Sequence, residues 1–143
     1  MDQTAATKQI GEEKDAEWYS KKFLANPQQQ EHYTASKYYF LFSALLARMA
    51  PDGGESVLDV GCGGGHMGGL LHDVGVKRYC GFDFSQARID HARAAYPGCE
   101  FHVADIFQTD LFKTCDYDIV ICTEVLEHIE RDGHGNGTLR LPP

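Results

Sequence analysis

The chain has 143 residues, 43% of them hydrophobic, which is enough to build the core of one globular domain. Its 13 Lys and Arg residues are outnumbered by 21 Asp and Glu residues, and the net charge of −8 argues against binding nucleic acid through overall charge. No apolar run reaches the roughly 20 residues that a transmembrane helix needs, so no membrane span is expected.

The five cysteines predict a reducing environment. They stand at positions 62, 80, 99, 115 and 122, an odd number without a C-x-x-C pair. This pattern indicates neither a disulfide framework nor a zinc site. Because free thiols at this density are typical of a reducing compartment, we expect a cytoplasmic location.

The amino-terminal part predicts a leader followed by a helix. We expect a mobile leader over residues 1–28, a partial domain core over residues 29–132 and an irregular tail over residues 133–143. Apolar residues recur at helical spacing from Tyr38 to Met49, which predicts an amphipathic helix at the start of the core.

Beyond that helix, strand-like and helix-like patterns alternate. The predicted strands cover residues 57–60, 79–84, 101–106 and 117–122, and the predicted helices cover residues 67–74, 85–96 and 124–131. Short connections between alternating strands and helices are typical of a parallel sheet with helices on both faces. The sequence therefore predicts an α/β fold with about four parallel strands.

The carboxyl ends of these strands hold the residues that suggest a ligand site, because α/β sheets bind ligands at that edge. The first strand contains Asp59 and runs into the glycine-rich loop GCGGG. Asp83 ends the second strand, Asp105 ends the third and Thr123 follows the fourth. Glycines let a ligand approach the main chain, and the helix after the loop offers unpaired N–H groups to an anionic ligand.

Two ligand classes use such a loop: dinucleotides, through pyrophosphate, and S-adenosylmethionine, through its amino-acid carboxylate. Asp59 favours the second, because a carboxylate suits the ammonium group of the methionine part and repels a pyrophosphate. The dinucleotide pattern G-x-G-x-x-G fails when counted from Gly61, since His66 stands at its last position, although it matches formally from Gly63.

The two later acids are consistent with a nucleoside ligand. Asp83 can accept hydrogen bonds from ribose hydroxyls, which both ligand classes carry. Asp105 offers a carboxylate to the amine of an adenine ring, and this favours S-adenosylmethionine. A nicotinamide-dependent oxidoreductase is therefore disfavoured by Asp59, His66 and Asp105.

Together, the segments VLDVGCGGG, GFDFS, VADIF and DIVICTEVLEH resemble, in order and spacing, the first four motifs of class I S-adenosylmethionine-dependent methyltransferases. The resemblance covers about residues 56–130 and implies a Rossmann-like sheet, S-adenosylmethionine as cofactor and transfer of its methyl group. By position, the resemblance implies that the methionine end of the donor is held by Asp59, Gly61, Cys62, Gly63 and Gly65. It implies that the ribose is held by Asp83 and Phe84 and the adenine by Ala104, Asp105 and Ile106. Thr123 would lie near the methyl group. The resemblance implies no catalytic residue, because methyl transfer from a sulfonium depends mainly on positioning.

A metal site is a weaker alternative. Glu124, Glu127 and His128 would share one face of a helix and could bind a divalent ion. The segment resembles the Glu-x-x-Glu-His segment of small-RNA 3′-terminal 2′-O-methyltransferases, in which a metal holds the ribose acceptor. EVLEH also resembles many quinone-type and small-molecule methyltransferases that use no metal, and we prefer the interpretation without a metal.

Members of this class continue with further strands that complete the sheet and much of the acceptor pocket. Here the sequence reads RDGHGNGTLRLPP after the fourth predicted strand, so we expect the later strands to be missing. The outer edge of strand 117–122 would then lack a neighbour and favour self-association. Two functions stay open: a methyltransferase, or its donor-binding portion, with an unidentified acceptor, and a non-catalytic nucleoside-binding module.

Overall fold

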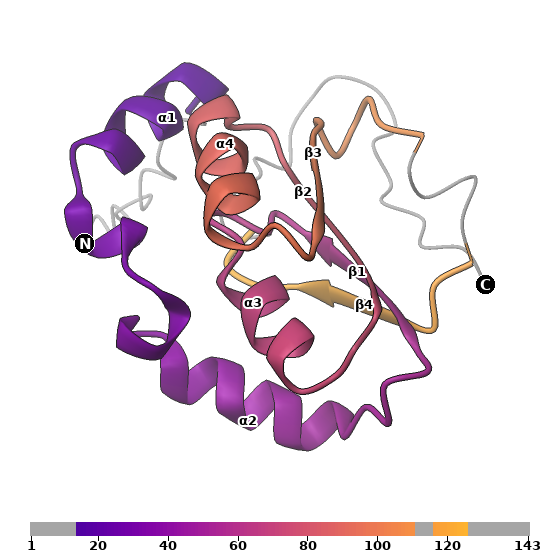
Figure 1. Ribbon diagram of the computed structural model, residues 1–143. Helices are drawn as coiled ribbons and strands as arrows, with labels where there is room; N and C mark the ends of the chain where they lie inside the picture. The colour runs from indigo at the N-terminus through magenta and orange to yellow at the C-terminus, as the bar shows by residue number, and fades with distance from the viewer. Residues whose placement is uncertain (1–13, 111–115, 126–143) are drawn as a thin grey trace, which may run out of the picture.

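Four parallel strands form the sheet of the computed structural model, which describes residues 14–110 and 116–125 (Figure 1). The strands are β1 (Ser56–Val60), β2 (Arg78–Asp83), β3 (Glu100–Val103) and β4 (Ile119–Cys122). They lie in the order β3-β2-β1-β4, and all three neighbouring pairs are parallel. The predicted α/β fold with a Rossmann-like parallel sheet is therefore confirmed.

The third strand is shorter than predicted. β3 ends at Val103 rather than at residue 106, because the chain turns at Asp105. The Asp105 carboxylate accepts a hydrogen bond of 2.9 Å from the N–H of Phe107, and the Asp105 carbonyl accepts one of 2.9 Å from the N–H of Thr109. Asp105 therefore lies in the loop just beyond the sheet.

The helices of the core lie close to their predicted positions. The described helices are α1 (Ala16–Leu24), α2 (Tyr39–Met49), α3 (His66–Asp73) and α4 (Gln86–Ala95), and the short 3₁₀ helices η1 (Pro27–Gln30) and η2 (Tyr33–Ala35) connect α1 to α2. α4 begins where it does because the hydroxyl of Ser85 accepts a hydrogen bond from the N–H of Arg88. The helix predicted over residues 124–131 falls almost wholly outside the described residues, as does the tail at 133–143.

Helix α1 departs from the expectation of a mobile leader through residue 28. The carboxylate of Asp15 caps this helix by accepting a hydrogen bond of 2.8 Å from the N–H of Trp18. The buried ring of Phe23 packs against the ring of His91 on α4, with 5.3 Å between ring centroids. From Ala16 onward the segment is therefore a packed part of the domain; residues 1–13 lie outside the described residues.

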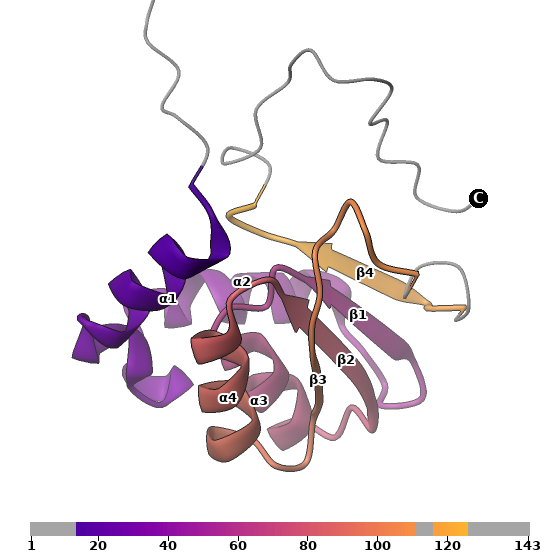
Figure 2. The ribbon, with the colours of Figure 1, turned by 90° about the horizontal axis from the view of Figure 1, so that it is seen from above.

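The core has two parts, one on each face of the sheet. On the first face, α3 and α4 pack against β2 and β3, and Figure 2 shows both helices on the same side of the sheet. Buried side chains of the four strands, of α3, and of α4 with its C-cap residue form one cluster: Val57, Met67, Leu70, Leu71, Tyr79, Ile89, Ala92, Tyr96, Phe101 and Ile121. On the second face, Leu58, Val60, Cys80 and Phe82 pack against Ala104, Ile106, Tyr117 and Cys122. Strand alternation explains this division, because successive residues of β1 point to opposite faces.

Strand β4 forms one edge of the described sheet, and hydrogen bonds of the residue just before it hold it to the start of β1. The carboxylate of Asp118 accepts hydrogen bonds from the N–H of Ser56 at 2.7 Å and from its hydroxyl at 2.9 Å. These bonds set the register in which Val57 faces Ile119. Although the sequence of β4 is typical of an interior strand, Val120 is 39% exposed.

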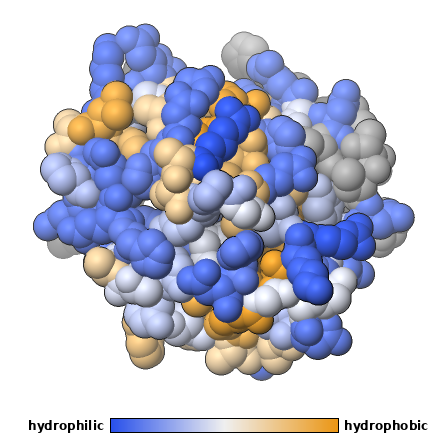
Figure 3. Space-filling model, in the orientation of Figure 1, coloured by the Kyte–Doolittle hydropathy of each residue, from blue (hydrophilic) through white to orange (hydrophobic). Residues whose placement is uncertain are grey.

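The surface is mixed in polarity. In Figure 3, hydrophilic residues cover much of the face toward the viewer, and apolar residues gather at the lower edge, where Figure 1 places α2. The ring of Phe40 on this helix is 85% exposed. None of the helices within the described ranges has the length and apolar character needed to cross a membrane.

Candidate functional site

The glycine loop after β1 is fastened to the end of β2. The N–H groups of Gly61 and Cys62 both donate hydrogen bonds to the carbonyl of Phe82, at 2.8 and 2.9 Å. The N–H of Gly65 then donates to the carbonyl of Cys62 at 3.0 Å, and α3 begins. The loop therefore has a defined shape that directs the amino terminus of α3 toward the carboxyl edge of the sheet.

Two glycines of this loop serve different purposes. Both have a positive φ, 56° at Gly63 and 84° at Gly65, a backbone conformation that residues other than glycine rarely adopt. At Gly65 a Cβ would lie 2.7 Å from the ring of Phe101 and 2.8 Å from the Cβ of Ala92, so the glycine is needed for packing. At Gly63 a Cβ would meet nothing within 4 Å. The main chain at Gly63 therefore has open space beside it, which a ligand could enter.

Asp83, at the end of β2, links the glycine loop to helix α4. One carboxylate oxygen accepts a hydrogen bond of 3.1 Å from the N–H of Gly63, and the other accepts one of 2.9 Å from the N–H of Ser85. The guanidinium of Arg88 lies 3.6 Å from the same carboxylate. Asp83 is buried, and these contacts compensate the loss of water around its charge.

Asp59 of β1 is buried and contacts Tyr79 of β2. Its buried carboxylate accepts a hydrogen bond of 2.8 Å from the hydroxyl of Tyr79. Burial raises the pKa of Asp59 to about 7; the Tyr79 hydrogen bond opposes this rise, and the charge of Asp83 adds to it. Burial likewise raises the pKa of the neighbouring Cys62 thiol.

A cavity opens where the loops after the four strands meet. It is lined by Lys14, Tyr19, Val60, Gly61, Phe82, Asp83, Phe84, Arg88, Ala104, Asp105, Ile106, Phe107, Glu124 and Val125. Six of the predicted donor-binding residues belong to this lining: Gly61, Asp83, Phe84, Ala104, Asp105 and Ile106. The other five, Asp59, Cys62, Gly63, Gly65 and Thr123, lie outside it.

The metal alternative depends on three residues, of which the structure describes only Glu124. Glu124 lines the cavity and has a φ of 57°, a backbone conformation outside the helix that the alternative requires. Glu127 and His128 lie outside the described residues. Their predicted common helical face with Glu124 therefore stays a prediction.

The glycine loop and the strands at the carboxyl edge of the sheet fall within a segment that matches a known protein family. A family model described as "Methyltransferase domain" matches residues 57–137, which include the glycine loop and the four strands except Ser56, the first residue of β1. This chain belongs to the methyltransferase domain family.

Similar proteins extend well beyond the matched segment. The "Probable S-adenosylmethionine-dependent methyltransferase" of Mycolicibacterium smegmatis is 30% identical over 100 residues, covering 70% of this chain and 37% of that protein. Trans-aconitate 2-methyltransferase of Shigella flexneri is 46% identical over 63 residues, covering 43% of this chain and 25% of that protein. The crystal structure of magnesium protoporphyrin IX methyltransferase from Synechocystis PCC 6803 with bound SAM has a TM-score of 0.52 and 28% identity, and the match covers 63% of this chain and 46% of that one.

Part of the cavity wall of this methyltransferase domain comes from residues that sequence reasoning missed. The ring of Tyr19 on α1 lies 5.2 Å from the ring of Phe84, and the guanidinium of Arg88 lies 5.1 Å from the Tyr19 ring. A hydrogen bond of 2.8 Å joins the hydroxyls of Ser20 and Ser85 beside them. No spacing in the sequence indicates that α1 reaches the cavity.

Proposed function

We propose that this chain binds S-adenosylmethionine in the cavity and forms the donor-binding portion of an S-adenosylmethionine-dependent methyltransferase. The observation that carries the proposal is the convergence of Gly61, Asp83, Phe84 and the segment Ala104–Ile106 on one cavity. These residues follow three different strands and come together only at the carboxyl edge of the sheet, where such folds bind ligands.

The chemistry of the wall suits each part of the donor. Asp83 has two oxygens with several acceptor positions, so it can accept from ribose hydroxyls while keeping its bonds to Gly63 and Ser85. Asp105 can accept from the adenine amine, and the apolar side chains of Ile106 and Phe107 offer surface to the ring. The open main chain at Gly63 leaves room for the amino-acid end.

Residues outside the cavity lining contribute by position and charge. We propose that Asp59 acts from beside the loop, where its negative charge, present as pH rises above about 7, favours a bound ammonium group without touching it. Cys62 and Gly65 hold the shape of the loop, and Thr123 follows β4 beside Glu124, near the place proposed for the methyl group. We further propose that Tyr19 and Arg88 complete the wall on the side of α1.

The acceptor is not assigned. The similar proteins are named for different acceptors, and the residues assigned here all serve the donor. For that reason a module that binds the nucleoside without catalysis is the second candidate. A cytoplasmic location stays a prediction from the cysteine pattern.

Isothermal titration calorimetry tests the donor proposal. The chain is titrated with S-adenosylhomocysteine, the demethylated donor, and in parallel with NAD. In titrations above pH 7, where Asp59 is mostly ionised, we expect binding of S-adenosylhomocysteine and weaker or undetectable binding of NAD, because Asp59 lies beside the glycine loop, where pyrophosphate would lie. Equal or tighter binding of NAD would contradict the proposal. Donor binding without methyl transfer to any tested acceptor would favour the binding module.

A further inference from the structure

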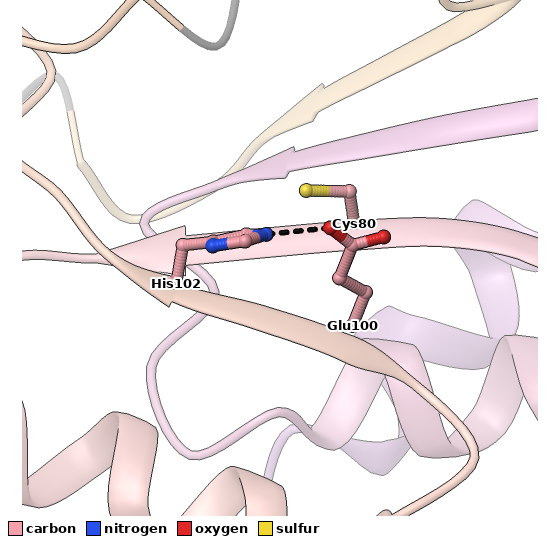
Figure 4. A group of neighbouring side chains, drawn as sticks. All are labelled: Cys80, Glu100 and His102. Atoms are coloured by element: carbon pink, nitrogen blue, oxygen red, sulfur yellow. Dashed lines mark hydrogen bonds and ion pairs between the residues drawn. The ribbon is translucent and has the colours of Figure 1, made fainter.

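A second group of chemically active side chains lies apart from the cavity, on β2 and β3. Cys80 comes from the middle of β2, and Glu100 and His102 come from β3 (Figure 4). None of the three lines the donor cavity. They form a cluster that the proposed function does not use.

The parallel register brings these three residues together. Cys80 is the direct partner of Glu100 across the two strands. Residues two apart on a strand point to the same face, so His102 stands beside Glu100. The Cys80 sulfur, a carboxylate oxygen of Glu100 and a ring nitrogen of His102 all lie within 4.8 Å of one another.

The cluster has a buried base and an exposed rim. Cys80 is 5% exposed and belongs to the apolar cluster on the second face of the sheet. The side chains of His102 and Glu100 are 39% and 66% exposed, and the Nε2 atom of His102 lies 2.6 Å from the Glu100 Oε1 atom. An ion arriving from solvent would meet the imidazole and the carboxylate first and the thiol below them.

We propose that Cys80, Glu100 and His102 bind a zinc ion. A sulfur, an imidazole nitrogen and a carboxylate oxygen form a set that suits zinc, whereas magnesium and calcium prefer oxygen ligands alone. On binding, the Cys80 thiol gives up its proton to solvent. The proton that His102 shares with Glu100 moves through solvent to the other ring nitrogen, so the imidazole stays neutral while His102 and Glu100 each bind the metal. The exposed rim leaves a fourth position for water.

The zinc site would fasten β3, an edge strand of the described sheet, to β2. The chain leaves β3 just after His102 and enters the segment Ala104–Ile106, which lines the cavity. This site could not be predicted from the sequence, because its ligands come from two strands and form no C-x-x-C pair. The inference is independent of the donor proposal, since none of its three residues lines the cavity.

Titration of the whole chain with Co²⁺ and Zn²⁺ tests the inference. Co²⁺ reports a thiolate ligand through its sulfur-to-metal charge-transfer band, and Zn²⁺ affinity is measured by competition with a chromophoric chelator. We expect one ion per chain, with the thiolate band lost in Cys80→Ser. In His102→Ala and Glu100→Gln we expect affinity to fall by at least about tenfold, the lower end of what loss of an outer-shell partner already costs a metal site.

Matched variants separate this site from other metal-binding side chains. Cys99→Ser and His72→Ala change the same residue types outside the cluster and should leave the band and the affinity unchanged. Because Cys80→Ser changes a buried residue, His102→Ala and Glu100→Gln at the exposed rim provide the test if it fails to fold. Zinc should also raise the melting temperature of the wild type but not of His102→Ala. Absence of the band, or equal loss of affinity in the control variants, would overturn the proposal.

Discussion

The hydroxyl of Tyr79 donates a hydrogen bond of 2.8 Å to the carboxylate of Asp59, and both side chains are buried. Gly81 makes room for this pair, because a Cβ at that position would lie 2.7 Å from the Tyr79 hydroxyl. Burial raises the pKa of Asp59 to about 7, well above its ordinary value of 3.8. The carboxyl group therefore holds its proton more tightly in the folded chain than in the unfolded chain.

This pKa shift predicts how stability depends on pH. The folded state binds the extra proton between about pH 4 and pH 7, so the contribution of Asp59 to stability falls as pH rises through that range and is constant above it. In Asp59→Asn this dependence is removed while an oxygen stays available to Tyr79. We expect the unfolding free energy of the variant, relative to wild type, to rise by up to about 4 kcal/mol from pH 4 to pH 7.

Urea denaturation at a series of pH values measures this difference. Taking the difference between the two proteins cancels the effects of His66 and His91, whose pKa values burial lowers. Tyr79→Phe removes the hydrogen bond that lowers the pKa of Asp59, so the upper end of the range should move above pH 7. A difference that does not change with pH would show that Asp59 is ionised in the folded chain throughout.

Replacing Asp83 should weaken donor binding. Asp83→Ala removes the proposed acceptor for the ribose hydroxyls and the bonds that hold Gly63 and Ser85. We expect S-adenosylhomocysteine to bind more weakly by ~1–3 kcal/mol in calorimetry, because a charged acceptor is lost. Asp90→Ala on α4 is the control, since its carboxylate accepts from Gln86 away from the cavity. An unchanged affinity in Asp83→Ala would place the donor elsewhere.

The open main chain at Gly63 gives a test of the loop. Gly63→Val should abolish donor binding, because its side chain would occupy the space above the loop and resist the φ of 56°. Gly75→Val is a matched control: Gly75 has a φ of 101° and a Cβ there also meets nothing within 4 Å. Circular dichroism should show helices and strands in both variants. If both bind the donor equally well, the glycine at 63 has no role in binding.

Helix α1 should contribute to donor affinity. Tyr19→Ala removes the ring that lies against Phe84 and Arg88 at the cavity wall. We expect a loss of ~1 kcal/mol in S-adenosylhomocysteine binding, the usual size of an aromatic contact. Leu24→Ala changes an exposed residue of the same helix outside the cavity and should have no effect. Equal affinities in the two variants would mean that α1 packs on α4 without serving the site.

The outer edge of β4 predicts self-association of this chain. In the described sheet β4 pairs with β1 alone, and an apolar edge can accept a strand from another molecule. We expect sedimentation velocity to show concentration-dependent association that Val120→Lys reduces. Val74→Lys adds the same charge at an exposed position on the carboxyl side of α3 and serves as the control. A wild-type chain that stays monomeric at every concentration would contradict the prediction.

Local patterns in the sequence predicted most of the fold. Apolar runs indicated β1 to β4, and helical spacing over residues 38–49 and 85–96 indicated α2 and α4. The packing of α1 was not predictable, because it depends on contacts such as that between Ser20 and Ser85, which are 65 residues apart. No spacing rule reveals such a pair.

The position of Asp59 shows where sequence reasoning about the site was incomplete. The resemblance placed Asp59 at the methionine end of the donor, and in the structure its side chain accepts a hydrogen bond from Tyr79. Strand alternation places Asp59 and Val60 on opposite faces of β1, and Val60 lines the cavity. The alternation could have shown that Asp59 is not part of the cavity wall. The cluster of Cys80, Glu100 and His102 could not be found in this way, because it needs the register between β2 and β3.

The hydrogen bonds between Asp118 and Ser56 join residues 62 positions apart. This separation in the chain affects how the sheet forms during synthesis on the ribosome. β1 can pair with β2 soon after it emerges, but its other edge must wait for β4. At translation rates of about 5–20 residues per second, that edge stays open for roughly 3–12 seconds. During this interval each nascent chain exposes an apolar strand edge to its neighbours on the same messenger RNA. The soluble yield in cells should therefore depend on chaperones that act before the chain is released.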